Sequence, residues 1–170
     1  MSLDHKAFEF DWGAFSEELA PLLHRALADD DAPALQQFVA AHIAACSSPY
    51  DGEPLGEDWE ELLETGTVQE LADFALTKYY APERDFGLSG AWLQLEASLP
   101  REVRAALLGN PLGPPERPFD PGLQGSYFQT PEQVRESVET LADITQVPLQ
   151  VFRDQLSEVV AHGKGLYVTF

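Results

Sequence analysis

The amino-acid sequence predicts a mostly helical α+β fold, in which a small sheet includes an N-terminal and a C-terminal strand. Two observations predict it: apolar residues recur at helical spacing through most of the chain, and both ends alternate apolar with polar residues. A chain of 170 residues, 44% of them hydrophobic, has the size and composition of one globular domain. We therefore expect a single compact domain over residues 1–170. It has an acidic helical first half (1–66) and a second half (67–170) with a Pro/Gly-rich crossover loop (109–125).

The first half of the chain opens with KAFEFDW, where aromatic side chains alternate with acids and predict a half-buried strand. The helical spacing of apolar residues then predicts helices within residues 15–27 and 35–46. Asp11 or Ser16 is available to cap the first of these helices. Pro21 lies inside the first pattern, so it either kinks that helix or begins a second one.

Two further helices are predicted on either side of Gly66. The segment EDWEELLETG carries an apolar stripe that begins at Trp59, and Gly66 is typical of a residue that ends a helix. The next four residues, TVQE, have the composition of a capping box, with Thr67 as the cap and Glu70 reaching back to it. We expect this second helix to run towards residues 79–80.

The second half contains shorter elements and more proline. In TPEQV, Thr130 caps a helix, Pro131 takes its first position and Gln133 completes a capping box. The expected elements are short helices at 92–97 and 101–108, a possible strand at 126–129, the helix that follows Thr130, a last helix from Pro148 to Gly163, and a closing strand in GLYVTF.

The charge of the chain is strongly negative and unevenly distributed. The formal net charge is −19 at pH 7, and residues 1–66 hold 15 acids against two bases. Such a field repels nucleic acids and anionic membranes, whereas it favours cationic partners or simple solubility. We therefore expect no nucleic-acid partner and no membrane, and we expect that any protein partner is basic.

Several classes of site are excluded by what the sequence lacks. The single cysteine, Cys46, rules out an internal disulfide and a multi-thiolate metal site, and its position is typical of a small buried side chain. The four histidines have no zinc-binding spacing, and no cofactor motif is complete, so we expect no metal and no cofactor. MSLDHKAFEF lacks the apolar core of a signal peptide, and a cytoplasmic protein is expected.

Three stretches of the second half carry a family resemblance. AWLQLEASLP, ALLGNPLG and GSYFQTPEQVRESVETLADI, followed by a C-terminal strand, resemble the YfbM-like family of uncharacterised bacterial proteins. The resemblance covers about residues 91–170, and the acidic first half does not align with that family. It implies a compact α+β fold and a bacterial cytoplasmic origin. It implies no reaction and no catalytic residue.

One segment, residues 51–64, holds seven acids and no base: Asp51, Glu53, Glu57, Asp58, Glu60, Glu61 and Glu64. Four of them recur at the spacing of one helix face, which fits a solvated surface. Like charges at this spacing cost about 0.2–0.5 kcal/mol per pair, so a surface that served stability alone would more often mix signs. The segment is therefore either a solvated face or a surface for a cationic partner. The second interpretation describes a non-enzymatic binding protein, such as an immunity-type or antitoxin-like inhibitor of a basic toxin.

The alternative hypothesis is an enzyme or a small-molecule-binding protein with a site near residues 109–130. Polar side chains around the crossover loop and the next helix start, together with an aromatic cluster, are its candidate residues. We expect Tyr79 and Tyr80 to be consecutive on a helix end, so that only one of them can point into the core. The candidate ligand-binding residues are Tyr79, Tyr80, Arg84, Trp92, Arg117, Ser126, Tyr127 and Thr130.

Overall fold

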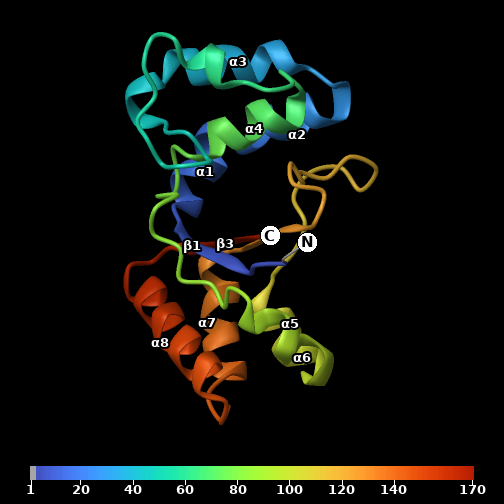
Figure 1. Ribbon diagram of the computed structural model, residues 1–170, viewed down its shortest axis with the longest axis vertical. Helices are drawn as coiled ribbons and strands as arrows, with labels where there is room; N and C mark the ends of the chain where they lie inside the picture. Colours follow the sequence, from blue (N-terminus) through green and yellow to red (C-terminus); the bar gives the residue numbers. More distant parts are fainter. Residues whose placement is uncertain (1–2) are drawn as a thin grey trace.

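A computed structural model describes residues 3–170 and confirms the mostly helical α+β fold (Figure 1). Three antiparallel strands, β1 (Lys6–Phe10), β2 (Ser126–Gln129) and β3 (Gly165–Thr169), form one sheet in the order β1–β3–β2. The C-terminal strand is therefore central, and Tyr167 faces Phe8 on one side and Phe128 on the other. Strands from both ends of the chain are thus part of the sheet, as predicted.

Within residues 3–170, eight α-helices lie on two sides of this sheet, with the first four on one side and the last four on the other (Figure 1). The first group is α1 (Trp12–Glu18), α2 (Ala20–Asp29), α3 (Ala32–Ala41) and α4 (Val68–Leu76). The second group is α5 (Ala91–Leu95), α6 (Arg101–Leu107), α7 (Pro131–Thr140) and α8 (Val147–Ala161). Among residues 3–170, no helix is both long enough and apolar enough to span a bilayer.

Two hydrophobic clusters hold these layers together, one on each face of the sheet. Phe8, Phe10 and Tyr167 pack with residues of α1 to α4, whereas Ala7 and Val168 pack with residues of α5 to α8. The prediction of a half-buried first strand was wrong in this respect. Ala7 on its second face is completely buried, because the second group of helices covers that face.

Both edges of the sheet are covered by short pieces of irregular chain. At the β1 edge, the Phe86 N–H donates to the Ala7 carbonyl at 2.9 Å, and the Ala7 N–H donates to Asp85 Oδ1 at 2.9 Å. At the β2 edge, Asn110 and Phe128 exchange two backbone hydrogen bonds of 2.9 and 2.8 Å. These pairings satisfy backbone groups that an open edge would expose to another chain.

Three local signals for helix starts, at Asp11, Pro21 and Thr130, are confirmed. Asp11 caps α1 by accepting a hydrogen bond from the Ala14 N–H at 3.3 Å. Pro21 begins a second helix rather than kinking one, because α1 ends at Glu18 and α2 carries the proline in its first turn. The Thr130 capping box is complete, and it begins α7 directly after β2.

The helix predicted within residues 57–66 does not form. Only Trp59–Leu62 is helical, as a single 3-10 turn, and Leu62 is 48% exposed although it belonged to the expected apolar stripe. The N–H groups of Glu64, Thr65 and Gly66 donate to the side chain of Glu70 rather than to helical carbonyls. Gly66 therefore does not end a helix. Repulsion between acids three and four residues apart further disfavours a helix over this segment.

The two adjacent tyrosines also differ from the prediction. Helix α4 ends at Leu76, so Tyr79 and Tyr80 lie beyond it and do not follow helical spacing. The Tyr79 ring lies 5.7 Å from the Phe15 ring, and the Tyr80 ring lies 4.8 Å from the Phe8 ring. Both rings therefore pack against the same hydrophobic cluster, which a helical pair could not do.

Candidate functional site

The seven acids of residues 51–64, which we call the acidic loop, lie between α3 and α4 and are all exposed. None of them belongs to any of the five ion pairs within residues 3–170. Over the same residues, no three His, Cys, Asp or Glu side chains are placed so that they could hold one metal ion. The loop thus presents separate carboxylates to solvent instead of a converging ligand set.

The acidic loop has a defined shape despite its lack of regular structure. Trp59 and Leu55 are 2% and 8% exposed and insert into the first hydrophobic cluster, where the Trp59 ring lies 5.9 Å from the Phe74 ring. The Leu55 N–H also donates to the Cys46 carbonyl at 3.3 Å. These two anchors hold the backbone of the loop against the fold, while the acids on either side of Trp59 remain exposed.

Glu70, in the first turn of α4, fixes the end of the acidic loop. Its carboxylate accepts hydrogen bonds from the N–H groups of Glu64, Thr65 and Gly66 at 2.6, 2.9 and 2.7 Å, and from the Tyr50 hydroxyl at 3.1 Å. Burial opposes ionisation of this carboxyl, but the three backbone donors outweigh it and lower the pKa of Glu70 to about 2.

The capping box predicted around Glu70 is therefore only half right. Thr67 caps α4, accepting a hydrogen bond from the Glu70 N–H at 3.4 Å, but the Glu70 side chain does not return to Thr67. It passes over the cap to Glu64, Thr65 and Gly66, and so it closes the loop that begins near Tyr50. A residue expected to stabilise a helix start instead shapes the neighbouring surface.

Two large apolar side chains are exposed in the same region as the acids. Tyr50, directly before the acidic loop, is 58% exposed, and Leu62, within it, is 48% exposed. Burial, together with the charge of Glu70, raises the pKa of Tyr50 to about 12, so its hydroxyl stays protonated and keeps its bond to Glu70. Exposed aromatic and aliphatic groups within a charged surface are typical of the central anchors of protein interfaces.

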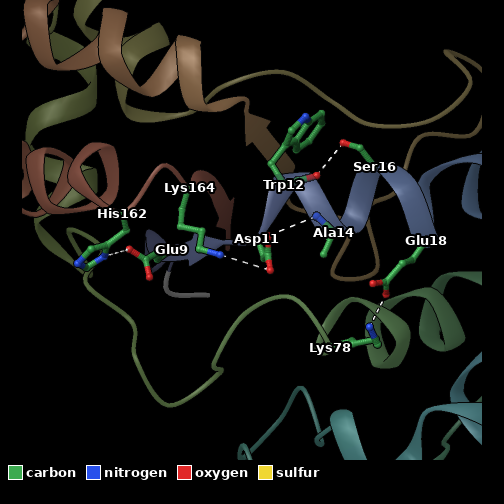
Figure 2. A network of polar contacts seen from close by, with 9 residues as sticks. All are labelled: Glu9, Asp11, Trp12, Ala14, Ser16, Glu18, Lys78, His162 and Lys164. Carbon is green, nitrogen blue, oxygen red and sulfur yellow. Dashed lines mark hydrogen bonds and ion pairs between the residues drawn. The ribbon is translucent and has the colours of Figure 1, made fainter.

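A cleft of about 730 Å³ lies between residues 78–87 and α8. Several of the charged side chains around it form ion pairs, which Figure 2 shows. His162 Nδ1 lies 2.6 Å from Glu9 Oε1, and Lys164 Nζ lies 3.4 Å from Asp11 Oδ2. Lys78 pairs with Glu18 at the far end of α1. These pairs join β1 and α1 to the chain around them.

Three of the eight alternative candidate residues meet in this cleft. Tyr79, Tyr80 and Arg84 all line it, and the Tyr79 hydroxyl donates to Glu18 Oε2 at 3.0 Å. Trp92 does not join them, because it is buried in the second hydrophobic cluster, where its ring stacks on His5 at 5.2 Å.

The other four candidates are dispersed around the crossover and β2. Arg117 is exposed on the crossover loop, Ser126 is buried beside Thr169 at 3.2 Å, and Tyr127 is half-buried. Thr130 is occupied as the helix cap: its Oγ1 accepts from the Gln133 N–H at 3.2 Å. Its own N–H donates to Gln133 at 2.9 Å, so the start of α7 keeps few donors for a ligand.

Cys46 is buried, as the sequence pattern predicted. Burial raises the pKa of its thiol to about 11, against a smaller opposing effect of a hydrogen bond with Thr77. The thiolate that would act as a nucleophile is therefore scarce at neutral pH.

Comparison with known proteins finds no family model, no curated protein and no solved structure that matches the chain. The resemblance of residues 91–170 to the YfbM-like family stays a prediction. Function therefore has to be inferred from the side chains themselves.

Proposed function

We propose that this protein is a non-enzymatic binding protein that docks a basic protein on the acidic loop, as an immunity-type or antitoxin-like inhibitor of a basic toxin would. The observation that carries this proposal is the set of seven exposed carboxylates without ion pairs, on a loop whose shape Glu70 and Trp59 fix. The loop backbone already has a defined shape in the free protein, so binding of a partner costs little conformational entropy in the loop.

The charges and the apolar groups have separate effects on this association. Carboxylates at the surface accelerate the encounter with a basic protein, and their effect weakens as salt shortens the range of the field. Tyr50 and Leu62 supply apolar area that a partner can bury, which mainly slows dissociation. Seven exposed carboxylates without ion pairs, next to two exposed apolar side chains, therefore favour a protein partner over a surface that is only solvated.

Charge reversal tests the proposal. The wild-type protein, used as bait, should capture basic proteins from a host extract at about 50 mM salt. A variant with Glu57, Glu60, Glu61 and Glu64 replaced by lysine should no longer capture them. All four side chains are exposed, so the melting temperature should stay within about 4 °C of the wild type. Affinity chromatography followed by mass spectrometry, and differential scanning calorimetry, make these two measurements.

A matched variant separates local recognition from net charge. Glu136→Lys, Glu139→Lys, Asp143→Lys and Asp154→Lys change the net charge equally, and these side chains are exposed on or beside α7 and α8. This control should still recover the basic proteins, and about 500 mM salt should release them from the wild type. Equal loss in both variants, or recovery that salt does not change, would contradict binding at the acidic loop.

A further inference from the structure

A second, smaller cavity of about 350 Å³ opens beside the acidic loop. Pro49 and Tyr50, which immediately precede the loop, form one side of it. The other sides are formed by β1, β3, the turn after α4 and the end of the crossover loop. We call it the Asp73 pocket, because Asp73 of α4 supplies one of its carboxylates. The cavity is therefore next to the surface on which we place the partner.

Asp73 differs from the other inward-facing carboxylate of α4. Glu70 accepts five hydrogen bonds, whereas the half-buried Asp73 carboxylate has no hydrogen bond and no ion pair with any residue of the described chain. Burial, together with the charge of Glu70, raises the pKa of Asp73 to about 7, against an opposing effect of Lys6. A carboxylate removed from water without a partner is costly, so the fold retains a group that does not stabilise it.

The walls around Asp73 are aromatic. The Tyr80 and Tyr167 rings meet edge to face at 5.1 Å, and the Phe8 ring lies 4.8 Å from the Tyr80 ring. Asp73 is close enough to the hydroxyls of Tyr50, Tyr80 and Tyr167 that its charge contributes to raising the pKa of each. Aromatic faces attract cations through their quadrupoles, and a carboxylate among them adds direct charge attraction.

We propose that the Asp73 pocket binds an organic cation, a lysine ammonium or an arginine guanidinium group, with Asp73 as its counter-ion and Tyr80 and Tyr167 as its walls. This deepens the proposed function and rests on it for the source of the cation, which is a side chain of the basic partner. Neutral ligands of the same shape gain nothing from the carboxylate, and anions are repelled by both Asp73 and Glu70.

The charged groups around the pocket give the binding a defined pH dependence. Asp73 faces Glu70 from its own helix, Lys6 from β1, Asp85 from the chain after α4, and the hydroxyls of Tyr50, Tyr80 and Tyr167. The cation selects the ionised carboxylate, so binding releases a proton and affinity rises as pH increases from about 6 to 8. Lys6 carries the same charge as the guest, and its removal should tighten binding.

Small probes test this inference without the protein partner. We expect N-acetyl-lysine methylamide and N-acetyl-arginine methylamide to shift the NMR signals of Asp73 and Tyr80 in a saturable manner, and the neutral N-acetyl-norleucine methylamide not to do so. Asp73→Asn should weaken binding of the charged probes at least tenfold at pH 8. Lys6→Gln should bind them at least as tightly as the wild type, and the exposed Asp143→Asn should not differ from it.

The fold provides its own control, because Asp73→Asn removes an unfavourable charge and should melt at or above the wild-type temperature at pH 8. Equal binding of the norleucine probe, or charged-probe affinity unchanged in Asp73→Asn, would overturn the pocket. If Asp73→Asn loses the probes while the acidic-loop variant keeps its basic partner, the proposed function is wrong and the pocket stands. If the acidic-loop variant loses the partner while Asp73→Asn keeps the probes, the proposed function stands and the pocket is wrong.

Discussion

Substitution of Gly87 by alanine should destabilise the protein by about 3 kcal/mol or more, because the added methyl group has no space. A Cβ atom at this position would lie 2.0 Å from the His5 carbonyl oxygen and 2.7 Å from the Lys6 Cα. These are backbone atoms in or next to β1, so no side-chain rotation can relieve the contact. Residues 85–89 would have to leave the strand edge that they cover, and we expect thermal unfolding to begin roughly 6–12 °C lower.

Gly13 provides the matched control for this substitution. It lies in α1, and the nearest atom to an added Cβ would be Asp11 Oδ1 at 3.9 Å. Gly13→Ala should therefore be neutral or stabilise the protein by about 0.5–1 kcal/mol, because alanine favours the helical backbone. Calorimetry of both variants decides the matter. A Gly87→Ala melting temperature equal to that of the wild type would show that residues 85–89 are not packed on β1.

Removal of the His5 side chain should have an effect of similar size. His5 is completely buried; its Nδ1 accepts from the Leu88 N–H at 3.1 Å, and its Nε2 donates to the Leu107 carbonyl at 2.8 Å. His5→Ala leaves both groups without a partner, at a cost of about 1–3 kcal/mol each. It also removes the ring that stacks on Trp92. We expect a melting temperature lower by roughly 4–24 °C, whereas His24→Ala on the exposed face of α2 should change it little.

The ionisation of His5 adds a pH signature to this prediction. Burial lowers the pKa of His5, against smaller opposing effects of its backbone hydrogen bonds and of Asp85. The unfolded chain therefore binds more protons than the folded one just below the ordinary histidine pKa. This contribution to stability is present above about pH 6.5 and is lost as pH falls towards the lower folded value. The wild type should lose more stability than His5→Ala between pH 8 and pH 5 in urea unfolding. Equal losses would contradict the buried neutral ring.

The parts of the fold that depend on neighbouring residues could be predicted from the sequence. The capping signals at Asp11 and Thr130 begin helices as expected, because a cap and the N–H group that donates to it lie within three residues. The alternating patterns at both ends of the chain also became strands. The sequence pattern was not sufficient where a side chain competes with backbone carbonyls for the same N–H groups. Glu70 draws three N–H groups away from the helix expected before Gly66.

The candidate sites depend on contacts between distant residues, which sequence spacing does not encode. His5 meets Leu107 across 102 residues, and Asp73 meets β1, β3 and the crossover loop in one pocket. The only sequence signal for Asp73 was a charge next to the apolar residues of α4, which is common on helix surfaces. The acidic loop is the opposite case, because exposure of its carboxylates follows directly from their density in the sequence.

The most direct test of the central claim, that a basic partner docks on the acidic loop, is a backbone NMR titration with a lysine octapeptide at low salt. We expect amide shifts to concentrate in residues 50–64 and in the adjoining Asp73 pocket, together with the indole signal of Trp59, which anchors the loop. The exposed acids on or beside α7 and α8, such as Glu136, Glu139, Asp143 and Asp154, should respond much less. Shifts of equal size at both places would mean that the peptide senses only net charge, and would contradict a specific surface at the acidic loop.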